Sequence, residues 1–156
     1  MPKETGEKLI ASNKKARHEY HILDTYEAGL VLTGTEVKSL RQGRANLTDG
    51  YAYIDGGQAF LDAVHIPEYS QGTWTNHSAR RKRKLLLHKR EIRKLYKAVS
   101  IRGQTLIPLK VYFNKRGIAK VLLGICKGKH THDKREAKRK RDSDREIRRE
   151  ISRYSD

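Results

Sequence analysis

Cysteine is almost absent from this sequence, because Cys126 is the only one among 156 residues. A single cysteine excludes an internal disulfide bond, and such sparing use is typical of proteins in a reducing compartment. Cys126 ends the apolar segment IAKVLLGIC. We therefore expect its thiol to be buried and unreactive rather than a catalytic nucleophile.

Long apolar segments are lacking as well. The N-terminal residues MPKETGEKLIASNKKARHEY contain no continuous apolar stretch of the kind that a signal peptide requires. Nowhere do apolar residues approach the run of about 18 that spans a membrane. The sequence thus predicts a soluble protein of the cytoplasm.

Acidic residues are scarce. Eighteen Asp and Glu stand against 35 Lys and Arg, which leaves a net charge of +17 and a pI of about 10.1. Such an excess is usually held for a polyanionic partner, and nucleic acid is the first candidate. An anionic membrane surface is the second, but it would require a large apolar face opposite the charge, which the basic stretches lack.

Motifs for catalysis are also missing: no nucleotide-binding glycine loop and no serine-hydrolase elbow occurs. The only cluster that resembles a metal site is HTHD, with His130, His132 and Asp133. This cluster begins a charged segment that has no apolar shell around it. We therefore interpret these side chains as solvated rather than as the metal site of a nuclease. We expect no enzymatic activity, no cofactor and no metal.

Alternating apolar and polar residues predict six short strands. YAYIDGGQAFLDAV is the clearest hairpin, because Gly56-Gly57 supplies the positive φ angles of a two-residue turn. TLIPLKVYFNKRGIAKVLLGIC is a second hairpin, with NKRG as its turn. Two further strands, at 18–23 and 26–33, are separated by a turn at Asp24-Thr25. In the second hairpin the apolar positions expected to share faces are Ile107, Leu109, Val111 and Phe113, then Ala119, Val121, Leu123 and Ile125.

Two segments have helical periodicity instead. GTEVKSLRQG predicts a short helix that Thr35 caps and Gly43 closes. Residues 89–100 predict another, capped by His88 with Glu91 at the capping-box position. Its apolar positions, spaced i, i+3, i+4 and i+7, are Ile92, Leu95, Tyr96 and Val99. Residues 67–83 lose periodicity, so we expect a long mobile loop there.

The elements together predict a mainly β protein: a small six-stranded antiparallel barrel of the OB type, with two to three short helices. Apolar residues become sparse after Cys126. We therefore expect residues 1–127 to form the barrel and residues 128–156 to form a basic tail that is disordered when free.

Basic residues gather with aromatic ones at several places. From Arg80 to Lys97 there are ten Lys or Arg and one Glu. A solvated charged face would explain any one cluster, but a ladder of cations suits phosphates, and Tyr or His beside it can stack on exposed bases. The clusters are Lys14, Lys15, Arg17, His18 and Tyr20; Lys38, Arg41 and Arg44; the block 80–84, including Arg83 and Lys84; and Lys89, Arg90, Arg93, Lys94 and Lys97.

The segments NKKARHEY, YEAGLVLTGTEVKSLR, RKLLLHKREI, TLIPLKVYF and GKHTHDKRE resemble, in order and spacing, the SsrA-binding protein (small protein B) family. The resemblance implies a six-stranded OB-type barrel that binds transfer-messenger RNA and brings it to stalled bacterial ribosomes for trans-translation. It implies no catalytic role. The implied partners are transfer-messenger RNA, the ribosome and, through the charged RNA, elongation factor Tu. Another OB-fold ribosomal or single-strand RNA-binding protein is the alternative that composition alone leaves open.

The resemblance also implies which residues contact the tRNA-like domain of that RNA. They are Asn13, Arg17, His18, Tyr20, Glu27, Leu86 and His88, and the neighbouring cations Lys14, Lys15, Lys38, Arg41, Arg83 and Lys84 complete the expected surface. The family commonly has Asn at the position of His88 and a second Lys at that of His130.

For the tail, the resemblance implies a segment that becomes helical in the empty message channel of the ribosome. Asp133 and Glu136 form a capping-box-like start, and Ile147, Ile151 and Tyr154 form a short apolar stripe. The residues expected to contact the ribosome are Lys127, Lys129, His130, His132, Asp133, Lys134, Arg135, Lys138, Arg139, Arg145, Ile147 and Ile151.

Overall fold

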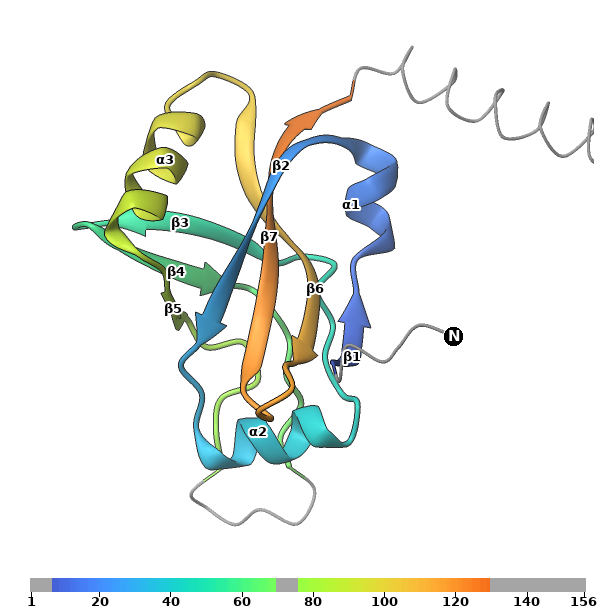
Figure 1. Ribbon diagram of the computed structural model, residues 1–156. Coiled ribbons are helices and arrows are strands. Elements are labelled where there is room, and N and C mark those ends of the chain that lie inside the picture. The colour runs from blue at the N-terminus through green and yellow to red at the C-terminus, as the bar shows by residue number, and fades with distance from the viewer. Residues whose placement is uncertain (1–6, 70–75, 130–156) are drawn as a thin grey trace, which may run out of the picture.

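The computed structural model describes residues 7–69 and 76–129 (Figure 1). Within these residues the chain forms three helices and seven strands. They are β1 (Lys8–Ser12), α1 (Lys14–Glu19), β2 (Tyr20–Leu30), α2 (Gly34–Arg41), β3 (Tyr51–Asp55), β4 (Gln58–Asp62), β5 (Arg83–Leu86), α3 (Lys89–Val99), β6 (Gln104–Phe113) and β7 (Ala119–Gly128).

The sheet closes on itself. Its strand order is β1-β6-β3-β4-β5-β2-β7, and β6 also pairs with β7, so β6, β3, β4, β5, β2 and β7 form a ring. Every pairing between these strands is antiparallel. The expected fold class is confirmed, and β1 is an additional strand that pairs with the far half of β6.

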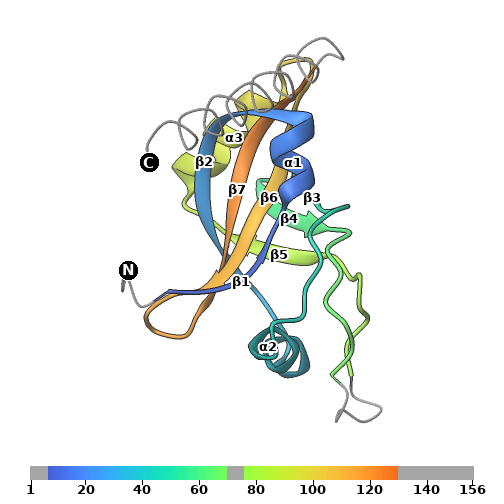
Figure 2. The same cartoon turned by 90° about the vertical axis from the view of Figure 1, so that its right-hand side faces the viewer.

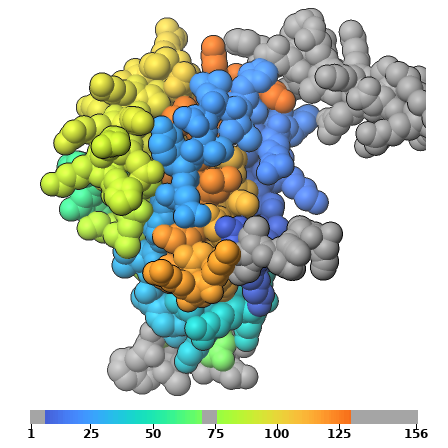
Figure 3. Space-filling model, in the orientation of Figure 1, coloured from blue at the N-terminus to red at the C-terminus, as the bar shows by residue number. Residues whose placement is uncertain are grey.

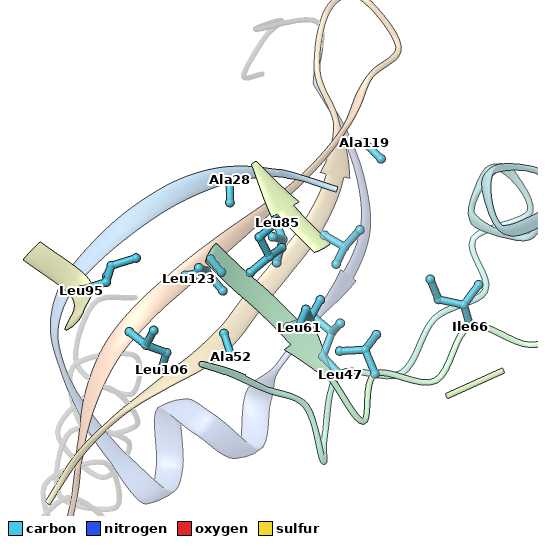
Figure 4. Packing of buried hydrophobic residues seen from close by; sticks show 14 of the residues in the cluster. Ala28, Leu47, Ala52, Leu61, Ile66, Leu85, Leu95, Leu106, Ala119 and Leu123 are labelled. Atoms are coloured by element: carbon cyan, nitrogen blue, oxygen red, sulfur yellow. The ribbon is translucent and has the colours of Figure 1, made fainter. Parts of the chain in front are cut away.

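The core lies inside this ring. Leu61, Leu85, Leu106 and Leu123 point inward from four different strands, and Leu95 enters from α3 (Figure 4). In β7 the expected shared face of Ala119, Val121, Leu123 and Ile125 is confirmed. Each strand contributes alternate residues to the core, as the period of two requires.

Strand β2 corrects the prediction of two strands with a turn at Asp24-Thr25. The strand runs without interruption from Tyr20 to Leu30 and pairs along its length with β7. A register shift between Ile22 and Asp24 marks a β-bulge, which accommodates one extra residue without ending the strand. The Asp24 carboxylate accepts the Thr25 N–H at 2.8 Å. Pairing with β7 keeps the backbone extended through Asp24 and Thr25.

Strand β6 corrects a second expectation. Ile107 and Leu109 were expected to share a face with Val111 and Phe113, but the pairing with β7 shifts register between Pro108 and Lys110. The bulge turns the strand, so Ile107 and Leu109 pack in a second apolar cluster with Ala16 and Cys126, while Val111 and Phe113 join the main core. Cys126 is buried, as expected, and burial raises the pKa of its thiol to about 11, which disfavours the thiolate.

The helix α1 and the strands β1 and β5 were not predicted. α1 begins at Asn13, whose side-chain oxygen accepts the Ala16 N–H at 3.1 Å. A helix of only six residues gives too weak a periodic signal to stand out in sequence. β5 lies within the segment that was taken as loop and basic block.

Local signals were more reliable for the other elements. Gly56 and Gly57 have positive φ angles of 59° and 76° in the β3–β4 turn. Gly43 closes α2, and Glu91 accepts the His88 N–H at 3.0 Å at the start of α3. Thr33 rather than Thr35 caps α2. Its hydroxyl accepts the Glu36 N–H, and the Glu36 carboxylate accepts the Thr33 N–H.

The two ends of the expected 67–83 loop are fixed in place. Asn76 bonds to both backbone groups of Tyr69, at 2.8 and 3.2 Å. His77 is buried, with one ring nitrogen 2.8 Å from the Ile66 carbonyl and the other 2.9 Å from the Thr35 hydroxyl. Residues 67–69 and 76–82 lack helix or strand, as expected, but Arg83 already belongs to β5. Within the described ranges, no helix is long and apolar enough to cross a membrane.

Candidate nucleic-acid interface

The start of β2 lies beside the end of β7 (Figure 3), and this brings two distant basic segments together. Tyr20 pairs with Gly128, and the Lys129 N–H donates to the Glu19 carbonyl at 2.9 Å. The sheet therefore continues past the expected boundary at residue 127. We call the resulting surface the α1 end. Its exposed or half-buried cations and imidazole are Lys14, Lys15, Arg17, His18, Lys127 and Lys129.

A hollow of about 300 Å³ lies beside the α1 end, between α1 and the segment 48–51. Lys15, Tyr20 and Tyr51 line it together with two carboxylates, Glu19 and Asp49. Asp49 lies 3.5 Å from Arg80, both of them on the surface. The cation of Lys15 and the aromatic ring of Tyr20 therefore line the same hollow.

A larger hollow, of about 510 Å³, lies between β2 and β5, and we call it the β2–β5 hollow. It brings together three residues that the sequence analysis assigned to RNA although they lie far apart in the chain. These are Glu27, Leu86 and His88. Gly29, Leu87, Glu91 and Lys120 complete its lining.

The hollow exists because Gly29 has no side chain. Four residues stand opposite one another across four neighbouring strands: Tyr112 on β6, Lys120 on β7, Gly29 on β2 and Leu86 on β5. A Cβ on Gly29 would lie 3.4 Å from Leu86 Cβ and 3.8 Å from Lys120 Nζ. The glycine therefore leaves a gap between an apolar side chain and a cation.

A hydrogen bond from β6 holds Glu27 in place. The hydroxyl of Tyr112, a buried residue, donates a hydrogen bond to the Glu27 carboxylate. Burial and the neighbouring Glu27 both raise the pKa of the Tyr112 hydroxyl, so it stays protonated as a donor. The carboxylate retains further acceptor capacity for a partner. Leu86 is 55% exposed on the opposite side of the gap.

The chemistry of the β2–β5 hollow suits a nucleotide. A carboxylate accepts hydrogen bonds from base amino groups, an exposed leucine offers an apolar surface, and Lys120 can pair with a phosphate. An imidazole such as His88 can stack or hydrogen-bond. Gly29, Lys120, Glu91 and Tyr112 were missed in the sequence analysis. The available signals were a glycine and a lysine interrupting two apolar strands.

Arg83 was expected to contact RNA, and the structure corrects this. Its side chain is completely buried: Nε donates to Glu36 at 2.5 Å, and two other nitrogens donate to the Val64 and Ala79 carbonyls. Arg81 donates to the same carboxylate. Burial alone would raise the pKa of Glu36, but bonds from Arg81 and Thr33 and the charge of Arg83 hold it below its ordinary value. Arg83 thus belongs to the core. We call Glu36, Arg81 and Arg83 together the buried ion cluster.

Asn13 is buried as well. It is 3% exposed, and its amide nitrogen donates to the Pro108 carbonyl at 3.0 Å and the Leu47 carbonyl at 3.2 Å. Its side-chain oxygen caps α1, and the residue also lines the hollow beside the α1 end. Asn13 therefore holds α1 against β6, and its contact with RNA stays a prediction.

The other expected contacts are dispersed. Lys38 and Arg41 lie on α2, at the end of the molecule away from α1 (Figures 1 and 2). Lys38 Nζ lies 5.5 Å from the centre of the Tyr69 ring. Lys84 faces outward from β5, opposite Phe60 of β4. Lys38 and Arg41 therefore lie on a different element from the β2–β5 hollow, whereas Lys84 shares the exposed face of β5 with Leu86.

The remaining expected residues, from His130 to Ile151, lie outside the described ranges, and so does the HTHD cluster. Among the residues that the structure describes, no group of three or more His, Cys, Asp or Glu could hold a metal ion.

Comparison with known proteins identifies close relatives. The model of the family described as "SmpB protein" matches residues 10–153. A protein named "SsrA-binding protein" from Leifsonia xyli subsp. xyli is 61% identical over 152 residues, covering 97% of this chain and 96% of the relative. Its counterpart in Streptomyces coelicolor is 62% identical over 152 residues, 97% of this chain and 95% of the relative.

A solved structure described as "tmRNA-SmpB: a journey to the center of the bacterial ribosome" contains a similar chain. The two share 51% sequence identity and a TM-score of 0.68. The similarity covers 83% of this chain and 94% of the other.

Proposed function

The chain belongs to the SmpB protein family, and from this premise we propose that it binds the tRNA-like domain of transfer-messenger RNA and delivers that RNA to stalled ribosomes for trans-translation. The observation that carries the proposal is the match over nearly the whole chain to proteins named for binding this RNA. The solved relative, described together with both this RNA and the ribosome, supports it. The proposed role is binding and delivery, with no chemical step of its own.

We assign the primary RNA contact to the β2–β5 hollow. Glu27 is the hydrogen-bond acceptor for a base, oriented by Tyr112. Leu86 packs against the base or its ribose, and Lys120 pairs with a phosphate. His88, at the start of α3, supplies a stacking or hydrogen-bonding surface at the edge. This division gives the Glu27 carboxylate a specific role on the RNA side of a strongly basic protein.

The α1 end is the second part of the proposed RNA surface. Lys14, Lys15, Arg17 and Lys127 would meet phosphates there, and Tyr20 would stack on a base. The tail, residues 130–156, is proposed to contact the ribosome in the message channel. On this proposal, Lys134→Ala with Arg135→Ala would leave RNA affinity unchanged and reduce tagging of stalled chains.

Gly29→Leu tests the assignment of the β2–β5 hollow directly. Gly29 has an ordinary φ angle, and a Cβ there makes only ordinary contacts, so the backbone accepts a side chain. The leucine would fill the space intended for a nucleotide. We expect affinity for the tRNA-like domain to fall by about tenfold or more, measured by filter-binding titration beside a reconstituted tagging assay.

Gly34→Leu is the matched control, because a Cβ on Gly34 also meets nothing that would displace the fold and lies outside the hollow. It should bind RNA like the unmodified chain. Equal binding by both variants would show that the hollow is not the contact. Failure of the unmodified chain to support tagging would refute the proposed function itself.

A further inference from the structure

Helix α3 leaves an aromatic ring on the surface. The sequence analysis expected Ile92, Leu95, Tyr96 and Val99 to form its inward face, but only Leu95 is fully buried. Tyr96 is 59% exposed. The apolar stripe of the helix is therefore wider than the sheet can cover, and the uncovered part needs another explanation.

Tyr96 lies at the edge of a hollow of about 490 Å³, between α3 and the β3–β4 turn, and we call it the α3 hollow. Figure 1 shows this turn beside the first residues of α3. Its apolar lining consists of Ile54, Ile92 and the Tyr96 ring. The space stays open because the turn is made of Gly56 and Gly57, where an added Cβ would meet nothing within 4 Å.

Cations border this apolar floor on one side. Arg93 and Lys97 stand one helical turn apart beside Tyr96, and both line the hollow. Arg90 and Lys94 are exposed on the same helix. Within the described ranges, no acidic side chain forms an ion pair with Arg93 or Lys97. Two acids adjoin residues that line the hollow. Asp55, the last residue of β3, precedes Gly56, and Glu91, which accepts the His88 N–H, precedes Ile92.

We propose that the α3 hollow binds an acidic protein segment, which inserts one apolar side chain between Ile54, Ile92 and Tyr96 and sets its carboxylates against Arg93 and Lys97. An aliphatic or aromatic anchor loses no hydrogen bond when it enters an apolar space, and the cations on the edge supply charge complementarity. A nucleobase fits this lining less well, because its edge would face Ile54 and Ile92 without partners.

The α3 hollow shares no residue with the β2–β5 hollow. α3 carries both, with His88 and Glu91 facing one and Ile92 and Tyr96 facing the other. Substitutions in the α3 hollow therefore leave the lining of the β2–β5 hollow unchanged. In Figure 3, the side chains of α3 form the left edge of the visible face.

The probe is a fluorescently labelled acetylated peptide of glutamates around a central Phe-Leu pair, titrated with the full-length chain and followed by anisotropy at near-physiological salt. We expect saturable binding below about 1 mM. Replacing Phe-Leu by Ser-Ser in the peptide, or Tyr96→Ser in the protein, should weaken it by about tenfold. Tyr96→Phe should retain it, and Tyr96→Ser should leave affinity for the tRNA-like domain unchanged.

A charge control separates this site from general attraction to a basic protein. Arg93→Gln with Lys97→Gln should weaken peptide binding several-fold more than Lys115→Gln with Arg116→Gln, which removes the same charge from the exposed β6–β7 turn. Equal effects of the two pairs would overturn the proposal, as would absence of saturable binding. Stronger dependence on Tyr96 for an oligouridylate than for the peptide would replace it with an RNA site.

Discussion

Two groups of acidic and basic side chains in this molecule use the same residue types in opposite ways. In the buried ion cluster, the Glu36 carboxylate is buried and pairs with the buried Arg83 and with Arg81, whose side chain is 31% exposed. In the β2–β5 hollow, Glu27 lines open space together with Lys120, and its bond from Tyr112 leaves acceptor capacity free.

The difference shows what a charge is for in each place. Buried charges that neutralise one another are fixed by the fold, and removing one partner leaves the other without compensation. A carboxylate on the surface of a protein with net charge +17 gains nothing for solubility or RNA attraction by being there. Its position is better explained by a specific contact. Substitutions in the buried ion cluster should therefore reduce stability, and substitutions at Glu27 should reduce RNA affinity.

Glu36→Gln should cause the largest loss of stability. The change leaves the Arg83 guanidinium completely buried without a counter-charge, and breaking a buried pair in this way costs about 3–5 kcal/mol. The measurement is the midpoint and slope of urea denaturation. The double variant Glu36→Leu with Arg83→Leu should recover part of the loss, because it removes both charges. A loss for Glu36→Gln of less than about 1 kcal/mol would show that the cluster does not stabilise the fold.

Acid should remove the same stabilisation in the unmodified chain. The folded protein holds the pKa of Glu36 below its ordinary value of 4.5, so the unfolded chain binds that proton more readily. The stability that Glu36 contributes is thus fully present above pH 4.5 and is lost as pH falls through the lower folded pKa. Glu36→Gln should show a flatter decline over this window in denaturation midpoints. Identical profiles would contradict the assignment.

These two clusters also show how far the sequence could predict the structure. The hairpin at Gly56-Gly57, the glycine that closes α2 and the start of α3 were found because turn and capping signals are local. The burial of Arg83 was not found, because RRKRKLLL has cations and leucines in both phases of the strand. Either phase could face inward, and only pairing with β2 and β4 selects Arg83 and Leu85.

The candidate site was predicted in part for a related reason. The family resemblance supplied Glu27, Leu86 and His88, and the structure brings them together. Gly29 and Lys120 could not be recognised, because their role depends on standing opposite each other across two strands. The resemblance also supplied Asn13, but it could not show that this side chain caps α1 and bonds to the Pro108 carbonyl of β6.

Glu27→Gln should weaken RNA binding by about tenfold while changing stability by less than about 1 kcal/mol. The direction of the change in RNA affinity distinguishes a specific contact from general attraction. Removing a negative charge from an RNA-binding protein should strengthen binding if only general attraction acts. Asp24→Asn, which removes a carboxylate from the same strand outside the hollow, should show that small increase. Filter binding with the tRNA-like domain measures both. An increase for Glu27→Gln as well would place Glu27 outside the RNA contact.

Tyr112→Phe should give the smallest effect. The phenyl ring fills the same buried space, so the loss of stability should stay near 1 kcal/mol, the worth of one hydrogen bond. The Glu27 carboxylate remains, but nothing orients it from β6. We therefore expect a reduction in RNA affinity of only a few-fold, smaller than that of Glu27→Gln.

A double-mutant cycle distinguishes orientation from a separate contribution. If Tyr112 acts through Glu27, adding Tyr112→Phe to Glu27→Gln should cause less additional loss of RNA affinity than Tyr112→Phe causes alone. Fully additive losses would mean that Tyr112 affects the RNA surface by another route, and the comparison between the two clusters would then need a second explanation for why Glu27 lies where it does.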